Sequence, residues 1–386
     1  MRPQSYDCYA ITPPGAESIT ARELSALGID PRASEPGGVS FRTDAGGIGR
    51  ANVELRTASR VIVRVATYHA SAFHELERRA DRLPWEAYVP PGRSVAFRVT
   101  SRKSKLYHQG AIAQRLGESV MLRVPGVTVS PGGLDSEERG NAESGVQLFV
   151  VRLFHDECTV SADSSGEHLH HRGYRLAGAK APLRETLAAA MLLAAGWDGT
   201  MPLIDPLCGS GTIPIEAALL ARRIAPGLRR TFACEQWATF PRSILASARS
   251  AAQERILSQA PAPILGSDRD AGAIDAASEN AERAGVLESI QLRKQAISAL
   301  ESPLGLGFVV TNPPYGIRVG RSRDLRDLYA QLGNVLRRRC SGWRVALLSA
   351  RDELARQTRL PLAPAFRTSN SGLRVKLLLA TIPPAA

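Results

Sequence analysis

The stretch Asp205-Pro-Leu-Cys-Gly-Ser-Gly-Thr212 decides the fold of the C-terminal half. It follows a short apolar segment, 202–205, and precedes an apolar run, 212–222, so it indicates a turn between a strand and a helix. Its two glycines permit a tight turn and close approach to a ligand, and the helix start presents free N–H groups. The spacing is neither the dinucleotide fingerprint nor a P-loop, because no Lys follows the second glycine. The candidate ligand-binding residues are Asp205, Leu207, Cys208, Gly209, Ser210, Gly211 and Thr212, with Asp205 placed to accept a cationic amine.

The segments that follow this turn alternate between strand and helix. Strands are expected at 262–268, 307–312, 343–349 and, last in the chain, 373–379, with helices at 271–284 and 325–338. Another helix, 183–195, precedes the turn. This alternation predicts an α/β domain with a doubly wound, parallel sheet.

A second acidic motif, Gly266-Ser-Asp268-Arg-Asp270, ends the next predicted strand. An acidic side chain at such a strand tip is placed to accept hydrogen bonds from ribose hydroxyls. Asp268, together with its neighbour Arg269, is therefore a candidate cofactor contact. The alternative role for an Asp here is to cap the following helix, and we assign that role to Asp270.

A third motif, Thr311-Asn312-Pro-Pro-Tyr315-Gly316, follows a buried strand. Asn-Pro is also a common turn starter, but a turn alone does not require Pro-Pro-Tyr after such a strand. The Asn312 side-chain oxygen and the Pro313 carbonyl can both accept N–H bonds from an exocyclic amine, while Tyr315 stacks on the base. The candidate catalytic residues are Asn312, Pro313, Pro314 and Tyr315, and Asn312 also borders the cofactor site.

Composition and charge restrict the classes of protein. Hydrophobic residues make up 44% and charged residues 22% of the 386 residues, which excludes a collagen-like, coiled-coil or largely disordered chain. The 49 basic residues exceed the 37 acidic ones, and this net charge of +12 favours a polyanionic partner such as nucleic acid. The longest apolar run, 187–196, is too short for a membrane span, and the N-terminus lacks a secretory signal. Five scattered cysteines without a C-x-x-C pair favour a reducing cytoplasm and argue against structural zinc.

The N-terminal half predicts two small α+β units. Residues 1–65 show the order strand, helix, strand, helix, strand. Residues 66–165 follow with helices at 73–83 and 107–122 and strands at 94–100, 147–154 and 157–162. A Gly/Ser-rich surface loop is expected at 131–145. Units of this size are suited to binding.

Together, the three motifs resemble motifs I, II and IV of S-adenosylmethionine-dependent amino-methyltransferases. Asp163-Ser-Ser-Gly-Glu-His-Leu-His-His-Arg172-Gly-Tyr-Arg175 resembles the signature that leads from a THUMP domain into the methyltransferase. Residues 97–107 resemble the THUMP strand–loop–helix, and 181–190 the helix placed over the methionine end of the cofactor. Over nearly its whole length the chain is similar to THUMP-domain class I RNA methyltransferases of the RlmL/YpsC group, which modify guanine N2 in large-subunit ribosomal RNA.

The resemblance implies a ferredoxin-like domain (1–65), a THUMP domain (66–165), a linker (166–181) and a Rossmann-like methyltransferase domain (182–386) with a mostly parallel seven-stranded sheet. It implies S-adenosylmethionine as cofactor, no metal despite the histidines at 168–171, and transfer to N2 of a flipped guanine, with 23S rRNA as the favoured substrate. A single catalytic domain is expected, unlike the fused RlmKL form. The expected RNA contacts are Arg102, Lys103, Lys105, Arg172, Arg175 and Arg318.

Several alternatives stay open. They are a tRNA guanine-N2 methyltransferase, an adenine-N6 methyltransferase of DNA or RNA, and a non-catalytic RNA-binding factor of ribosome assembly. The chain also departs from the family pattern in two places. Residues 294–298 carry no acidic side chain for the cofactor adenine, with Ala296 where one is often found, and Ile317 replaces an acid before Arg318. The sequence does not specify an oligomeric state.

Overall fold

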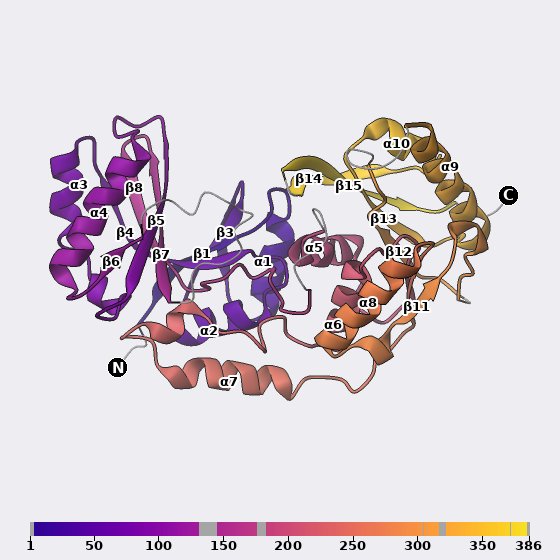
Figure 1. Ribbon diagram of the computed structural model, residues 1–386, viewed down its shortest axis with the longest axis horizontal. Coiled ribbons are helices and arrows are strands. Elements are labelled where there is room, and N and C mark those ends of the chain that lie inside the picture. The colour runs from indigo at the N-terminus through magenta and orange to yellow at the C-terminus, as the bar shows by residue number, and fades with distance from the viewer. Residues whose placement is uncertain are drawn as a thin grey trace. The chain divides into compact units, whose positions relative to one another are not determined.

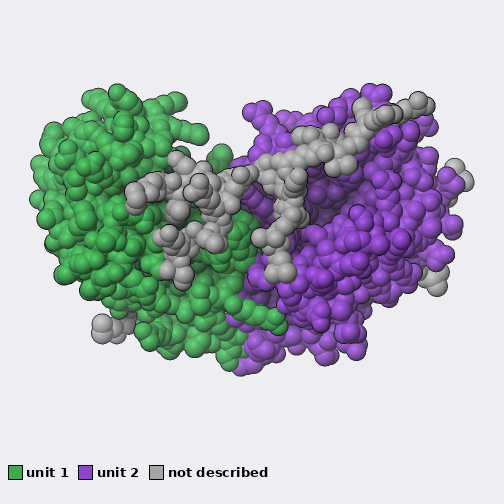
Figure 2. All heavy atoms as spheres, viewed as in Figure 1, with its two compact units in different colours: residues 1–12, 20–171, 229–251 green, residues 13–19, 172–228, 252–386 purple. Residues whose placement is uncertain are grey.

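The computed structural model describes residues 4–130, 145–175, 183–303, 305–315, 322–370 and 372–383. The chain forms two compact units, coloured separately in Figure 2. Unit 1 comprises residues 1–12, 20–171 and 229–251, and unit 2 comprises residues 13–19, 172–228 and 252–386. Residues 229–251 lie in sequence within the predicted methyltransferase domain, but they pack as part of unit 1.

Unit 1 is built on one eight-stranded sheet with the order β2-β3-β1-β4-β8-β7-β5-β6. Its strands are β1 (Tyr6–Ile11), β2 (Pro31–Glu35), β3 (Gly38–Thr43), β4 (Arg60–His69), β5 (Ser94–Arg102), β6 (Thr128–Val129), β7 (Val146–Phe154) and β8 (Glu157–Asp163). Strand β4 pairs antiparallel with β1 on one side and with β8 on the other. The boundary expected between residues 65 and 66 falls inside β4, so the two predicted N-terminal domains share a sheet.

The helices of unit 1 are most of α1 (Glu17–Ala26), α2 (Ala45–Glu54), α3 (Phe73–Ala80), α4 (Gln109–Arg123) and most of α7 (Arg242–Gln253), with 3-10 turns η1 (Trp85–Ala87) and η2 (Ala233–Gln236). Trp85 is fully buried and meets Phe97 and Phe149 edge-on. Helix α7 approaches α2 closely, since a Cβ on Gly49 would lie 2.9 Å from Ile244 Cγ2. The glycine therefore makes room for α7 in unit 1.

Unit 2 contains a seven-stranded sheet with the order β11-β10-β9-β12-β13-β15-β14. Its strands are β9 (Leu203–Asp205), β10 (Ile264–Asp268), β11 (Gln291–Lys294), β12 (Phe308–Thr311), β13 (Arg344–Ser349), β14 (Ala363–Asn370) and β15 (Leu373–Thr381). The first five strands in this order are parallel, and β15 is antiparallel to both β13 and β14. The prediction of a mostly parallel seven-stranded sheet is confirmed.

Helices cover both faces of this sheet, as Figure 1 shows. They are α5 (Glu185–Ala195), α6 (Thr212–Ala221) and α8 (Ala271–Ala284) on one face, and α9 (Ser322–Arg339) and α10 (Asp352–Gln357) on the other, with 3-10 turns η3 (Leu287–Ser289) and η4 (Ile297–Ala299). Alternate strand residues enter the two cores: Phe308 and Val310 pack on the α5–α6 side, and Val309 on the α9 side. Burial on both faces explains why the strands are continuous apolar runs.

The predicted helices and strands are present in the structure, with ends that shift by a few residues. The short strands β2, β6 and β11, the strand β14 and the helices α7 and α10 were not predicted. The predicted loop at 131–145 lies, except for its last residue, outside the described residues, as does 176–181 of the predicted linker. Within the described ranges, no helix combines the length and apolarity needed to cross a bilayer.

Candidate active site

Asp205 ends β9 and is buried, with 1% of its surface exposed. Its Oδ1 accepts hydrogen bonds from the Thr311 hydroxyl at 2.8 Å and from the Leu207 N–H at 3.2 Å. Burial raises the pKa of Asp205, these two hydrogen bonds lower it and the nearby carboxylate of Asp268 raises it slightly, which together bring the pKa to about 7. Asp205 is therefore a buried acid that needs a cation to ionise fully at neutral pH.

The predicted turn follows at once and joins β9 to α6. Gly209 and Gly211 both have left-handed backbone conformations, with φ of +51° and +82°. A Cβ on Gly211 would lie 2.9 Å from Ala277 Cβ, so this glycine is required for the packing of α6 against α8. A Cβ on Gly209 would meet nothing within 4 Å, so the turn leaves open space there. Asn280 of α8 holds the turn by donating to the Ser210 carbonyl at 3.0 Å.

Asp268 ends the neighbouring strand β10 and is half-buried. Its Oδ2 accepts from the Gly209 N–H at 3.1 Å, and its Oδ1 accepts from the Asp270 N–H at 3.0 Å. Asp270 caps α8 by accepting from the Gly272 N–H at 2.9 Å, which confirms the predicted cap. The second acid therefore lies directly against the glycine turn.

The other predicted cofactor residues lie in or beside the same turn. Leu207 and Ser210 are half-buried, Cys208 and Thr212 are buried, and Arg269 is exposed.

The Asn-Pro-Pro-Tyr segment begins directly after β12, the sheet neighbour of β9. The Thr311–Asp205 hydrogen bond ties the two strand ends together, so Asn312 is one residue from the group that contacts the buried acid. The Tyr315 hydroxyl donates to Asn312 Oδ1. Burial raises the pKa of the Tyr315 hydroxyl, which keeps it a neutral donor at physiological pH. Pro313 is buried and Pro314 exposed, whereas Ile317 and Arg318 lie outside the described residues.

This arrangement lies at the point where the strand order reverses. From β9 the chain proceeds outward to β10 and β11, and it then returns to the other side of β9 to form β12 and β13. Ligands of open α/β sheets bind beyond the carboxyl ends of the strands at such a switch point. Asp205 and Asn312 follow the two strands that border it.

The residues present fit S-adenosylmethionine. The open side of the turn at Gly209 provides space, and two acids flank it, one buried and one half-exposed. Asp205 would hold the cationic amine of the cofactor, the turn would contact it through main-chain groups, and Asp268 would accept from the ribose hydroxyls.

Two arginines that we expected to contact RNA are internal to unit 2. The guanidinium of Arg172 is 2% exposed and lies 3.6 Å from the carboxylate of Glu216, so in the observed conformation it pairs with an internal acid and is not accessible. Arg175 lies 3.5 Å from Glu185 and donates to the Thr212 hydroxyl at 2.5 Å. Arg172 neutralises the buried Glu216 within α6, and Arg175 neutralises the buried Glu185 at the start of α5. These pairs explain why both guanidinium groups lie inside unit 2.

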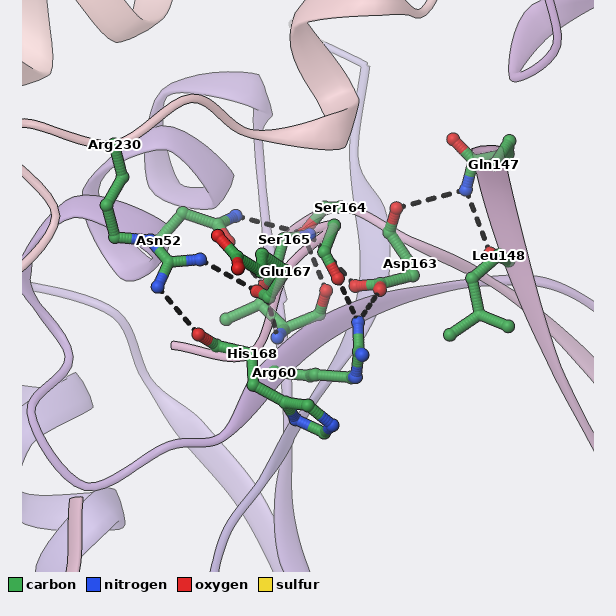
Figure 3. A network of polar contacts seen from close by, with 12 residues as sticks. Asn52, Arg60, Gln147, Leu148, Asp163, Ser164, Ser165, Glu167, His168 and Arg230 are labelled. Carbon is green, nitrogen blue, oxygen red and sulfur yellow. Dashed lines mark hydrogen bonds and ion pairs between the residues drawn. The ribbon is translucent and has the colours of Figure 1, made fainter. Parts of the chain in front are cut away.

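Residues 163–168, the first part of the 163–175 signature, lie inside unit 1, as Figure 3 shows. Asp163 is completely buried and pairs with Arg60, which also donates to the Gly166 carbonyl. Arg230, from the segment 229–251, donates to the carbonyls of Glu167 at 2.8 Å and His168 at 2.6 Å. The stretch 163–168 therefore pairs internal charges through the Asp163 side chain and through the main-chain carbonyls of Glu167 and His168.

His168 and His170 stack on each other, and the ring of His171 meets both of them edge-on. Within the described ranges, no three His, Cys, Asp or Glu side chains gather as metal ligands. The remaining predicted RNA contacts, Arg102, Lys103 and Lys105, are exposed at the end of β5 and in the loop that follows it.

A sheet of this order, with a glycine turn and an acid after β9 and a second acid after β10, defines a class I methyltransferase. The RMKL-like methyltransferase domain matches residues 172–372, and the RlmL ferredoxin-like domain matches residues 7–62. The chain belongs to the RMKL-like methyltransferase family, whose cofactor is S-adenosylmethionine.

Named relatives agree with this assignment. YpsC of Bacillus subtilis, provisionally named an RNA methyltransferase, is 34% identical over 353 residues, which are 90% of this chain and 89% of YpsC. The ribosomal RNA large subunit methyltransferase K/L of Syntrophotalea carbinolica is 35% identical over 387 residues, which are 96% of this chain. The chain spans about half the length of that K/L protein, 53%.

Solved structures show the same fold over the whole chain. A Listeria monocytogenes protein described as a predicted N6-adenine-specific DNA methylase superposes with a TM-score of 0.85 at 33% identity, covering 98% of this chain and 97% of that one. SMU.472, provisionally described as a methyltransferase and complexed with SAH, also has a TM-score of 0.85 at 27% identity, covering 99% of this chain and all of that one.

Proposed function

We propose that this protein transfers a methyl group from S-adenosylmethionine to the exocyclic N2 of a guanine in 23S rRNA. The observation that carries the proposal is the hydrogen bond between Thr311 and Asp205, because it fixes Asn312 beside the cofactor turn. An amide oxygen next to a methyl donor is suited to accept an N–H from an exocyclic amine. The names of the K/L relatives support ribosomal RNA as the substrate, and the net charge of +12 is consistent with it.

The cofactor supplies an activated methyl group when bound. The contribution of the protein is mainly to position the amine, because proximity and orientation can lower a barrier by several kcal/mol. Tyr315 donates to Asn312 Oδ1, so this oxygen has a fixed direction. An amide oxygen has two lone pairs and can accept from the tyrosine and from the substrate together. In this proposal the Pro313 carbonyl is the second acceptor, and the half-exposed ring of Tyr315 stacks on the flipped base.

The test is mass mapping of methylated nucleosides in ribosomal and transfer RNA from a strain that lacks the gene. We expect one N2-methylguanosine to disappear from 23S rRNA and to return with the wild-type gene but not with Asn312→Ala. Loss of N2-methylguanosine from tRNA alone would move the proposal to a tRNA substrate. Loss of N6-methyladenosine, or of no methylated nucleoside, would overturn it.

The role of the Tyr315 hydroxyl can be separated from that of its ring. Tyr315→Phe keeps the ring but removes the donor to Asn312, so we expect a lower kcat with little change in RNA affinity. Tyr315→Ala also removes the ring and should weaken base binding by about 1–3 kcal/mol. Equal losses of RNA affinity in both variants would contradict the separate roles.

A further inference from the structure

Phe154, the last residue of β7, is an exposed aromatic side chain surrounded by cations. Of the surface of Phe154, 40% is exposed to solvent. The Lys103 ammonium lies 5.9 Å and the Arg152 guanidinium 5.5 Å from the centre of its ring. The His155 ring meets it edge-on at 4.4 Å between centroids. We call these four residues the Phe154 platform.

The backbone around the platform is held in an uncommon conformation. His155 and Asp156 form the two-residue turn between β7 and β8, and both have positive φ, 52° and 62°. Lys103, in the neighbouring loop, also has a positive φ of 51°. Two consecutive left-handed residues form the turn that two-residue hairpins favour, so these conformations of His155 and Asp156 follow from the hairpin itself.

Asp156 fixes the hairpin turn to its neighbouring segments through three hydrogen bonds. Its N–H donates to the Ser104 hydroxyl at 2.9 Å, and its Oδ1 accepts from the Lys105 N–H at 2.7 Å. Its carbonyl accepts from the Ala70 N–H at 2.8 Å. The hairpin turn and the loop that carries the lysines are therefore fixed to each other.

The charges around the platform are mixed, with an excess of cations: Arg102, Lys103, Lys105 and Arg152 lie near it, as do the acids Glu35, Asp156 and Glu157. Lys103 and Lys105 are exposed, and among the described residues no carboxylate lies within ion-pairing distance of either ammonium group. Arg152 approaches Glu35 at 3.6 Å, but both side chains are about half exposed and water screens the pair. The cations over the Phe154 ring are exposed side chains that a base can displace, and the ring with the two lysines is then complementary to a nucleobase and its phosphates.

We propose that the Phe154 platform binds an unpaired nucleotide of the RNA substrate, with the base stacked on Phe154 and the flanking phosphates near Lys103 and Lys105. The proposal rests on the proposed function because it takes RNA as the ligand. It adds a recognition element for single-stranded RNA that is separate from the pocket for the target base. A duplex offers no free base face and is not expected to use the platform.

The test uses the full chain and a short single-stranded RNA that carries the fluorescent base aminopurine, whose emission is quenched on stacking. We expect Phe154→Ala to raise the Kd by about 5- to 150-fold and to abolish the quenching, while Phe154→Trp retains both. The salt dependence should not change, because no phosphate contact is lost. Lys103→Ala should instead lower the slope of log K against log salt by about 0.7 and retain the quenching.

Two controls make the outcome decisive. Leu122→Ala removes another exposed apolar side chain, 80% exposed on α4, and should leave the Kd unchanged. A blunt RNA duplex should bind equally to wild type and Phe154→Ala. If the wild type binds the single strand but Phe154→Ala binds it equally well, the platform is refuted and the proposed function stands. If the wild type binds neither RNA, the platform is refuted, and the mass mapping of methylated nucleosides decides the proposed function separately.

Discussion

The raised pKa of Asp205 predicts that cofactor binding depends on pH. Burial raises this pKa to about 7 from an ordinary value of 3.8. At about 1.4 kcal/mol per pH unit, the difference corresponds to about 4 kcal/mol that opposes ionisation in the folded protein. A bound ammonium group favours the ionised carboxylate, so the ligand can bind tightly only where Asp205 has lost its proton.

The size of this pH dependence of cofactor affinity follows from the linkage between proton release and ligand binding. Below about pH 7, binding must displace one proton, so affinity should fall by about tenfold for each pH unit. At alkaline pH it should fall again, because the α-amino group of the ligand then loses its own proton. At about pH 6, binding should release about 0.9 proton from Asp205.

The assay is titration calorimetry with S-adenosylhomocysteine, which carries the amine but no sulfonium charge. Measurements in buffers of different ionisation enthalpy give the number of protons released. Asp205→Asn is the matched control, since it keeps the shape of the side chain and cannot ionise. Its affinity should be weak and flat between about pH 5 and about pH 7. A wild-type affinity that is equally flat would refute the reasoning.

The same carboxyl affects stability, and other buried groups give further predictions. An acid with a raised pKa binds a proton more strongly in the folded state than in the unfolded state. The free energy of unfolding, measured by urea denaturation, should therefore fall by up to about 4 kcal/mol as pH rises from about 4 to about 7. Asp205→Asn should not show this loss of stability. Gly211→Ala should lower the free energy of unfolding more than Gly209→Ala does. Both variants place alanine in a left-handed conformation, at a cost of about 1–2 kcal/mol, but only Gly211→Ala also collides with Ala277. Gly209→Ala should instead lose more cofactor affinity, measured by calorimetry, for the stability that it loses. Asp163→Ala leaves the charge of Arg60 buried and should cost about 3–5 kcal/mol in the same assay, and no change would contradict the ion pair as a stabilising contact. Arg172→Ala should destabilise the protein without changing the salt dependence of RNA binding, whereas a reduced salt slope would restore its role as an RNA contact.

The sequence predicted the central part of unit 2 because its signals are local. A glycine turn between an apolar strand and an apolar helix, and an Asp that caps the next helix, are set by neighbouring residues. The position of Asp205 beside Asn312 followed from the alternation of strands and helices. The hydrogen bond from Thr311 that joins them was missed, because it depends on a pairing between β9 and β12 that no local pattern specifies.

We assigned Arg172 and Arg175 to RNA because a basic residue in an RNA-binding protein suggests phosphate, whereas the structure pairs both with internal acids. A signal against that interpretation was present in the sequence. Glu216 lies in the middle of α6, which is otherwise apolar on all sides, and a buried acid requires a cation. Likewise, α7 has a regular apolar side, with Leu245, Ala248 and Ala252 buried, but nothing in its own residues indicates which unit it joins.

The segment 229–251 also determines when unit 1 can be completed during synthesis. The chain changes units after residues 12, 19, 171, 228 and 251, so neither unit is a continuous stretch. At about 5–20 residues per second, a ribosome needs about 4–16 s to proceed from residue 171 to residue 251. During this interval the nascent sheet of unit 1 has all its strands but lacks α7, and the carbonyls at Glu167 and His168 lack Arg230. Translation speed across this stretch is therefore a variable that can alter the yield of native protein without any change in its amino-acid sequence.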